Sequence, residues 1–321
     1  MKVRYNEFFA MEIDRMKRYN SLNEELKREF GSKVMKISID GGFTCPNRDG
    51  TIGARGCIFC GEEGSGEFAG SRLDPLKVQV DKQKRLLSKK WKTDKIIIYF
   101  QNFTNTYGPI ERLRKIYYQA LIIEGVVGLA IATRPDCLNE DVLDLLSEIN
   151  KKTYLWVELG LQTIHEKTAK FIRRAYPLKV YDEAISNLKS RDIRVVTHVI
   201  LGLPGESREE ILETIRYVGN TQTWGIKLHS LYIQKDTDLY SYYLKNPFPI
   251  MTKDEYISLL VDGLTLLPPD MVIHRLTGDG QRELLYEPKW TLNKLGVLSS
   301  IDRELKIRQS YQGEKYKKVY P

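Results

Sequence analysis

The stretch CPNRDGTIGARGCIFC, residues 45–60, contains three of the four cysteines of this 321-residue chain. Eleven residues separate Cys45 from Cys57, and two separate Cys57 from Cys60. Thiolates are soft ligands that suit zinc, copper(I) or iron–sulfur clusters. Glycines throughout this segment give its backbone the freedom to wrap closely around a bulky group. The spacing therefore predicts a metal-binding loop.

Three thiols on one loop give a metal group an incomplete set of protein ligands. Structural zinc normally has four, and the histidines that could supply a fourth, His165, His198, His229 and His274, all lie far along the chain. Iron–sulfur clusters usually have four cysteine ligands, so three would leave one iron open. An open position is typical of metal sites that bind substrate. The loop thus favours a catalytic cluster, and Cys137 is predicted to be a lone packed thiol.

The cysteine loop follows the first of six β-rich segments that alternate with helical patterns. These segments are residues 34–40, 96–100, 129–133, 155–159, 194–201 and 226–233. Such alternation is typical of parallel β/α units, whose right-handed crossovers curl the sheet. We predict an α/β fold: a partial (β/α)6 barrel of the TIM type, with an open doubly wound sheet as the alternative. Both place ligands at the carboxyl ends of the strands, where the cysteine loop lies.

The flanking segments differ from this central pattern. Residues 1–33 indicate an N-terminal helical extension, and residues 34–240 form the predicted barrel. Residues 241–321 are predicted to be a mostly helical cap over the barrel mouth that binds substrate or RNA. Helices are expected to begin after Asn139 and after Ser207, where Ser207 and Glu210 have the spacing of a capping box.

Charge and composition restrict the class of protein. The net charge of +8 favours polyanionic partners, because each phosphate contact releases a condensed counterion. Basic runs at 81–95 and 303–321 agree with a nucleic-acid partner, although solvated surfaces would explain each run alone. No apolar run is long enough to span a membrane, and the charged N-terminus lacks the pattern of a signal peptide. We expect a cytoplasmic protein without membrane contact; its oligomeric state is not predicted.

Several strings beyond the cysteine loop carry a family resemblance. They are GGFTCPNRDG, GCIFC, YFQNFTNTYGP, VELGLQT, HVILGLPGE, KLHSLYI, HRLTGDG and PKW. With them the chain resembles the radical S-adenosylmethionine (SAM) superfamily, and the resemblance covers nearly the whole chain. The common cysteine spacing in that superfamily is three residues and then two. The spacing of eleven and two resembles a bacterial group related to the radical SAM domain of elongator-type tRNA enzymes.

The resemblance implies both cofactors and chemistry. Cys45, Cys57 and Cys60 would bind a 4Fe–4S cluster, and SAM would occupy the open iron. The reduced cluster would cleave SAM and produce a 5′-deoxyadenosyl radical. The implied substrate is tRNA, with the 5-substituent of a wobble uridine changed from carboxymethylaminomethyl to aminomethyl. A reductase or a flavodoxin- or ferredoxin-type protein would donate the electron.

Polar residues at the strand ends are the candidates for SAM contacts. The resemblance places the SAM ammonium at QNFTNTYGP, after the second strand. A carboxylate among apolar neighbours needs a partner, so Glu158 would bind ribose or ammonium, or else pair with a barrel lysine. Arg174 could hold the SAM carboxylate through its planar fork. The predicted cofactor-binding residues are Gln101, Asn102, Thr104, Asn105, Glu158, Gln162, Arg174, His198, Gly202 and Tyr232.

The sixth strand and the cap supply candidates for the substrate. Lys227 and His229 share one face of the strand, and a buried lysine needs a polar surrounding, so both are predicted catalytic or substrate-contacting residues. In the cap, charged residues and an aromatic suit a stacked base and its phosphates, with a salt-bridged packing interface as the alternative. These cap residues are His274, Arg275, Asp279, Lys289 and Trp290.

Two other functions remain open on the sequence alone. One is a radical SAM enzyme that acts on a small molecule or a peptide. The other is a non-catalytic RNA-binding protein that zinc or a cluster stabilises. Replacing the three cysteines separates them, because only an enzyme would lose turnover while it keeps RNA binding.

Overall fold

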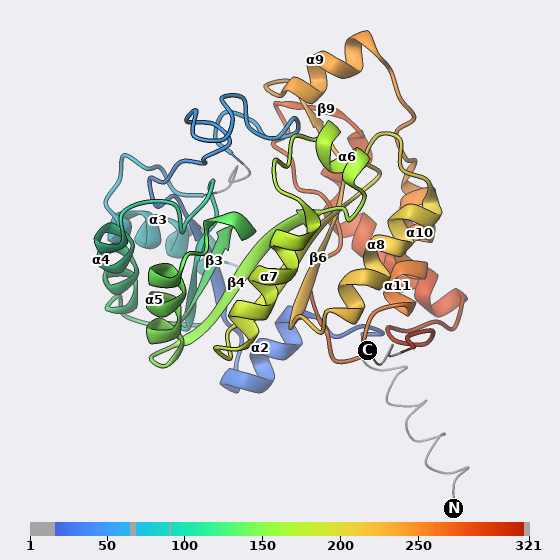
Figure 1. Cartoon of the computed structure of the whole chain (residues 1–321). Coiled ribbons are helices and arrows are strands. Elements are labelled where there is room, and N and C mark those ends of the chain that lie inside the picture. Colours follow the sequence, from blue (N-terminus) through green and yellow to red (C-terminus); the bar gives the residue numbers. More distant parts are fainter. Residues whose placement is uncertain (1–16, 65–68, 90, 318–321) are drawn as a thin grey trace, which may run out of the picture.

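A seven-stranded parallel sheet forms the centre of the molecule (Figure 1). The computed structural model describes residues 17–64, 69–89 and 91–317. The strands follow the order of the sequence, β1-β2-β3-β4-β5-β6-β8. Their bounds are β1 (Met35–Ile39), β2 (Ile96–Phe100), β3 (Val126–Thr133), β4 (Tyr154–Gln162), β5 (Arg194–Leu201), β6 (Gly225–Ser230) and β8 (Val272–Arg275). A small antiparallel pair joins β7 (Ile233–Gln234) to β9 (Leu285–Glu287).

The predicted partial barrel of six β/α units is confirmed, and the structure adds one strand. The extra strand, β8, comes from residues 241–321, which were predicted to form a mostly helical cap. It pairs in parallel with β6, through Gly225 opposite Val272 and Ile226 opposite Ile273. That segment therefore extends the barrel wall as well as covering it. Residues 1–16 of the predicted N-terminal extension lie outside the described residues.

Helices connect the strands and begin where side chains cap them. Asn139 accepts a hydrogen bond from the amide of Val142, as predicted. Ser207 and Glu210 form the predicted capping box, which satisfies amides that lack a partner within the helix. The helices are α2 (Leu22–Phe30), α3 (Leu76–Ser88), α4 (Ile110–Leu121), α5 (Glu140–Asn150), α6 (Glu166–Phe171), α7 (Leu178–Lys189), α8 (Arg208–Asn220), α9 (Asp238–Lys245), α10 (Lys253–Thr265) and α11 (Lys294–Ile307). Short 3-10 turns lie at Pro135–Cys137 and Lys289–Leu292.

The two faces of the sheet are covered differently. Helices α3, α4, α5, α7 and α8 pack on the outer face, and α10 and α11 lie beyond α8. The inner face is closed at its amino-terminal end by α2, where Leu26 packs with Ile97 and Trp156. Phe30 meets Tyr154 edge to face at 5.3 Å. The carboxyl ends of the strands are left as the mouth of the barrel, beneath the cysteine loop, α6 and α9 (Figure 1).

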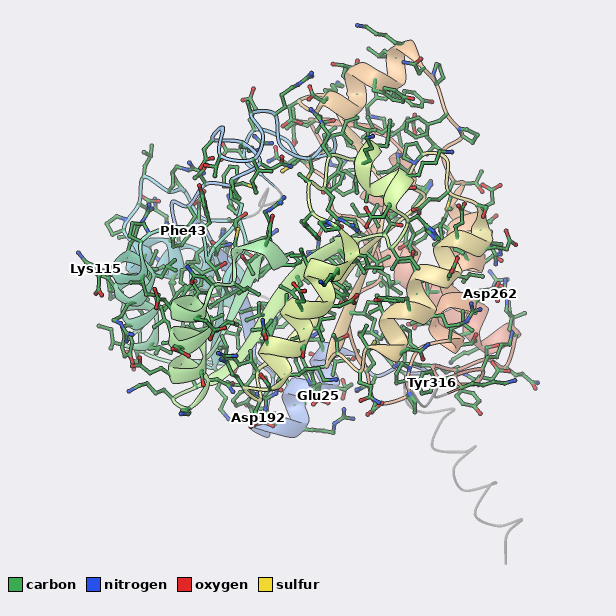
Figure 2. All side chains as sticks on the ribbon, in the orientation of Figure 1. Glu25, Phe43, Lys115, Asp192, Asp262 and Tyr316 are labelled. Carbon is green, nitrogen blue, oxygen red and sulfur yellow. The ribbon has the colours of Figure 1, made fainter. Side chains whose placement is uncertain are left out.

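Side chains fill the space between the sheet and its helices, and charged ones such as Lys115 point outward (Figure 2). No helix among the described residues is both long and apolar enough to cross a bilayer.

Candidate active site

The cysteine loop, residues 45–60, folds back on itself before it reaches Cys57. Two amides from its tip donate to the carbonyl oxygen of Pro46, at 2.8 and 3.2 Å. The amide of Gly56 donates to the carbonyl oxygen of Asn47 at 2.6 Å. These bonds close the long gap between Cys45 and Cys57 into an excursion whose two ends lie together. The eleven residues between Cys45 and Cys57 therefore do not hold the two thiols apart in space.

Two polar side chains inside this excursion fix its shape. Arg48 donates to the carbonyl oxygens of Cys60 and of the next residue, both at 2.6 Å. Asn47 is buried, and its Nδ2 donates to the carbonyl oxygen of Arg173 at 2.7 Å. The same Nδ2 donates to Sγ of Cys57 at 3.7 Å. Such a donor stabilises a thiolate more than a thiol, so Asn47 favours the anionic form of Cys57.

The segment that leads into α9 holds the cysteine loop from the opposite side. The amide of Leu239 donates to the carbonyl oxygen of Ile58 at 2.8 Å. The carboxylate of Asp238 pairs with Arg55 at 2.9 Å and with Arg173 at 2.6 Å. Residues far apart in sequence thus position the loop. The pair of Asp238 and Arg173 also links α9 to the segment after α6.

Cys45, Cys57 and Cys60 line one cavity, together with polar side chains from β2, β3 and β4. Burial raises the pKa of Cys57, against the opposing effect of Arg134, and raises the pKa of Cys60 to about 12, against that of Arg48. A negative charge on Cys45 adds to the rise in both pKa values, and one on Cys57 adds to the rise for Cys60. Metal ligation removes the thiol proton, and these arginines favour the resulting negative charge.

The donor set fits a 4Fe–4S cluster with one open iron. The cavity offers three sulfurs, a side-chain amide aimed at one of them, and two arginines that balance negative charge. Among the described residues, no three His, Cys, Asp or Glu side chains converge on a single ion. A cluster needs no such convergence, because each thiolate binds a different iron.

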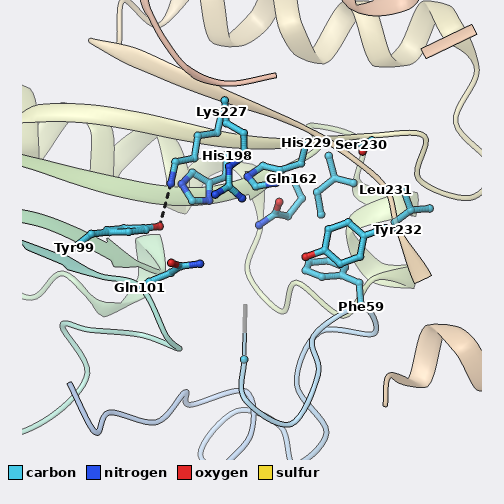
Figure 3. A pocket seen from close by; sticks show the side chains of 13 residues that line it. Phe59, Tyr99, Gln101, Gln162, His198, Lys227, His229, Ser230, Leu231 and Tyr232 are labelled. Carbon is cyan, nitrogen blue, oxygen red and sulfur yellow. Dashed lines mark hydrogen bonds between the residues drawn. The ribbon is translucent and has the colours of Figure 1, made fainter. Parts of the chain in front are cut away.

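A buried network occupies the barrel interior beside this cavity. Glu158, which is 1% exposed, accepts hydrogen bonds from Nζ of Lys227, from Nε2 of His198 at 2.8 Å and from Nε1 of Trp156 at 2.8 Å. Nζ of Lys227 also donates to Oη of Tyr99 at 3.0 Å, the dashed line in Figure 3. The ion pair between Glu158 and a barrel lysine, one of the two predicted roles, is present.

The network determines the protonation states of its members. Burial alone would raise the pKa of Glu158, but Lys227, Lys36 and His198 hold that pKa well below its usual range. Burial and the neighbouring Lys227 lower the pKa of His198 to about 4, although Glu158 opposes them. His198 is therefore a neutral imidazole, and its Nε2 carries the hydrogen that it donates in the hydrogen bond to Glu158.

A second cavity opens at the barrel mouth, toward β6 and β8 (Figure 3). It shares Phe59, Tyr99, Gln101, Gln162 and His198 with the cysteine cavity. The two cavities are therefore adjacent parts of one site. In Figure 3 the rings of Phe59 and Tyr232 lie together at one side of the mouth, opposite Tyr99 and Gln101.

Most of the predicted site residues lie around these two cavities. Gln101, Gln162 and His198 line both. Thr104, Glu158, Arg174 and the three cysteines line the cysteine cavity, and Lys227, His229 and Tyr232 line the barrel mouth. The roles predicted for these side chains remain proposals.

Asn102, Asn105 and Gly202 are not among the residues that line either cavity. Nδ2 of Asn102 donates to Asp40 at 3.0 Å, and Nδ2 of Asn105 donates to the carbonyl oxygen of Ala132 at 2.8 Å. These amides hold the turn after β2 in place. Gly202 lines a separate small cavity with Trp290.

Arg174 and Trp290 are already engaged by the protein. The guanidinium of Arg174 donates to the carbonyl oxygens of Thr163 at 2.6 Å and of Tyr176 at 3.0 Å, and its third nitrogen pairs with Glu166. Nε1 of Trp290 donates to a backbone carbonyl, and its ring packs on Tyr256 at 5.1 Å. The packing alternative considered for the cap thus describes Trp290.

Sequence reasoning missed several residues of the site. Tyr99, Arg134, Asn47 and Arg48 line or support the cavities, yet none was singled out. Arg134 follows β3 directly, so its position at a strand's carboxyl end was an available signal. The role of Tyr99 had no such signal, because a tyrosine within an apolar strand is typical of a core position.

Comparison with known proteins shows the family to which the chain belongs. The chain matches the model of the radical SAM superfamily over residues 49–218. It is also 48% identical to the protein YtqA of Bacillus subtilis (strain 168), over 94% of both chains. The chain belongs to the radical SAM superfamily. A second match, to the radical SAM C-terminal domain, covers residues 223–307 of this superfamily member.

More distant radical SAM relatives include elongator proteins. The chain is 27% identical to elongator complex protein 3 of Schizosaccharomyces pombe, over 61% of this chain and 37% of that protein. In space it resembles the archaeal Methanocaldococcus infernus Elp3, with a TM-score of 0.65 and 17% identity. That match covers 88% of this chain and 64% of the other, and it shows the shared fold.

Proposed function

We propose that this chain binds a 4Fe–4S cluster through Cys45, Cys57 and Cys60 and uses SAM to modify tRNA in the cytoplasm. The observation that carries the proposal is the pair of adjacent cavities, one lined by the three thiols and the other by the polar barrel mouth. When bound, the cluster and SAM supply a carbon radical that abstracts hydrogen from the substrate.

The chain's own residues position the reactants. Gln101, Gln162 and His198 face both cavities, so they contact SAM where it lies between the cluster and the substrate. Phe59 lines both cavities and supplies an apolar wall beside the thiols. Glu158 already accepts three hydrogen bonds, so we assign this carboxylate to orienting Lys227 and His198 rather than to binding SAM itself. Thr104 completes the wall of the cavity that binds SAM, and Tyr232 completes the wall of the cavity that binds the substrate.

The proposed substrate is the 5-substituent of a wobble uridine, in a step of the carboxymethylaminomethyl to aminomethyl type. Two observations support a tRNA substrate: the net charge of +8, and the relationship to elongator complex protein 3. The electron comes from a reductase or from a flavodoxin- or ferredoxin-type protein. Lys227 and His229 contact the substrate from β6.

The cofactor part of this proposal is tested with anaerobically reconstituted protein. We expect about four irons and four sulfides per chain, and 5′-deoxyadenosine when dithionite and SAM are added. Cys57→Ala should remove both the iron and the product. Cys137→Ser is the matched control, because Cys137 does not line the three-thiol cavity, and it should keep both. Stoichiometric zinc in place of iron would contradict the proposal.

The substrate part is tested on tRNA nucleosides. Cells that lack this protein should accumulate the unmodified precursor at the wobble position, and purified protein should convert that precursor in isolated tRNA. Active SAM cleavage with unchanged tRNA would instead indicate a small molecule or peptide substrate. RNA binding that persists without any SAM cleavage would indicate a binding protein.

A further inference from the structure

The barrel mouth contains more positive than negative charge. Four cationic side chains influence one another there, Lys36, Lys227, Arg275 and Lys294. Two carboxylates face them, Glu158 and Asp279. Within the described part of the chain, these four cations therefore outnumber the carboxylates that face them by two. Lys227 is 2% exposed and the side chain of Arg275 is 24% exposed, so water reaches this surplus only in part, and a bound anion would balance it.

The two carboxylates are already committed to other groups. Glu158 accepts from Lys227, His198 and Trp156, and Nζ of Lys36 lies 3.9 Å from its Oε1. Nζ of Lys294 donates to Oδ2 of Asp279 at 2.5 Å. Little acceptor capacity remains for a further cation.

Arg275 and His229 are the groups left over. The guanidinium of Arg275 lies 4.0 Å from Oδ2 of Asp279, beyond hydrogen-bond distance, and it lines the mouth cavity. Nε2 of His229 is buried and has no hydrogen-bond partner among the described residues. His229 lines the same cavity. A cation and an unpaired imidazole nitrogen thus border one space.

The surplus charge also disfavours protons on its neighbours. Burial and Arg275 together lower the pKa of His229, and burial lowers the pKa of Lys36 while Arg275 and Lys294 add to that effect. An anion in the cavity would reverse these electrostatic contributions and give each group a counter-charge.

We propose that Arg275 and His229 form a subsite for an anionic oxygen group of the substrate, a carboxylate or a phosphate, with Lys227 and Lys36 as supporting charges. This inference rests on the proposed function of the same site. The planar fork of Arg275 matches two oxygens of either group. Nε2 of His229, when protonated, donates to the same oxygens.

The position of the subsite assigns it to the substrate rather than to SAM. In the proposed function SAM would bind at the open iron, and therefore beside the cavity lined by the cysteines. Arg275 and His229 line only the mouth cavity, and the three cysteines line only the other. The subsite therefore selects substrates with an acidic group, because a neutral analogue would leave the cations unpaired.

The test uses the full-length, cluster-loaded protein and three variants, Arg275→Ala, Arg275→Lys and Arg282→Ala. Arg282 is exposed on a nearby segment and does not line the cavity, so it is the matched control. Arg275→Ala should lower kcat/KM for tRNA modification by about 10- to 100-fold, as expected when a charged hydrogen bond is lost. Arg275→Lys should recover part of the loss, and the control should match the wild type.

Two further measurements locate the anion. SAM cleavage without tRNA should stay within about twofold of wild type in Arg275→Ala. The loss of a charged contact to SAM would lower cleavage by more than that. If it falls together with modification, the anion is the carboxylate of SAM, and the proposal is wrong. Crystals soaked in bromide should show an anomalous peak beside Arg275 and His229 in the wild type but not in Arg275→Ala. No wild-type peak would overturn the subsite.

These outcomes separate the subsite from the proposed function. A bromide peak in a protein that never modifies tRNA would reject the tRNA substrate and keep the anion subsite. Conversely, full tRNA modification by Arg275→Ala would reject the subsite and leave the proposed function intact. To distinguish the two anion classes, acetate and inorganic phosphate are each titrated against the bromide peak, and the competitor effective at lower concentration identifies the group.

Discussion

Glu158→Gln keeps the size of a buried side chain and removes its charge. The ammonium of Lys227, 2% exposed, then loses the carboxylate that it contacts. Breaking a buried ion pair by removing one partner costs about 3–5 kcal/mol. The cost has a ceiling, because the lysine can lose its proton instead. Deprotonating a group with an ordinary pKa near 10.4 at pH 7 costs about 5 kcal/mol. We therefore expect a loss of about 3–5 kcal/mol.

The pH dependence gives this prediction a second, independent readout. Burial lowers the pKa of Lys227 and Glu158 opposes that effect, so the variant should have a still lower pKa at this lysine. Between that value and the unfolded pKa, the unfolded chain binds the extra proton. Stability of the variant therefore rises with pH, by up to about 1.4 kcal/mol per unit. Its deficit relative to the wild type should narrow as pH rises from the pKa of Lys227 in the variant toward that in the wild type, which is itself below the ordinary value, and should stay constant above that.

The assay is urea unfolding followed by tryptophan fluorescence, on cluster-loaded protein at several pH values. The double variant Glu158→Gln with Lys227→Met is the control, because it removes both charges and should recover at least about 1 kcal/mol of the loss. Two results would refute the reasoning. One is a cost below about 1 kcal/mol for Glu158→Gln. The other is a double variant no more stable than the single one.

Three other perturbations test the backbone, the cysteine loop and the cluster ligands. Gly125→Ala should destabilise the fold by more than 2 kcal/mol, since Gly125 has φ +84° and an added Cβ would lie 2.3 Å from a backbone carbonyl oxygen. Gly31→Ala, with φ +69° and open space around it, should cost only about 1 kcal/mol in the same urea assay. Asp238→Ala removes two partly exposed ion pairs, with Arg55 and Arg173, that hold the cysteine loop, so amide exchange in the loop should speed up about two- to fivefold by mass spectrometry; unchanged exchange would contradict a holding role. In electron paramagnetic resonance, Cys60→Ser should weaken or abolish the reduced-cluster signal, whereas Cys137→Ser should leave it unchanged.

The barrel could be predicted from sequence because its strands are apolar runs separated by capped helices. Strand β8 escaped prediction because VIHR is short and half polar, and it becomes a strand only by pairing with β6. The same distinction applies to the site. Cys45, Cys57 and Cys60 share a loop and a chemistry, so their convergence was readable from local sequence.

Partners that lie far apart in sequence were harder to predict. Glu158 and Lys227 were each recognised as buried charges, and a lysine partner for Glu158 was one of two alternatives. The sequence could not decide between them, because 69 residues separate the pair and the contact depends on the curl of the sheet. Asn105 was assigned to SAM through the family resemblance, and that role stays a prediction; its Nδ2 serves the backbone of β3. Polar residues at strand ends bind either ligands or the turn itself, and only coordinates distinguish these uses.

The excursion between Cys45 and Cys57 closes on itself through hydrogen bonds to Pro46 and Asn47. Its tip is therefore a side branch, anchored at a neck next to the first thiol. Residues can be added or removed at the tip without changing the separation of the sulfurs. A fluorescent or affinity tag inserted beside exposed Ile52 should leave cluster assembly intact. The number of residues between Cys45 and Cys57 therefore reflects the length of the side branch, whereas the hydrogen bonds at the neck set the separation of the thiols.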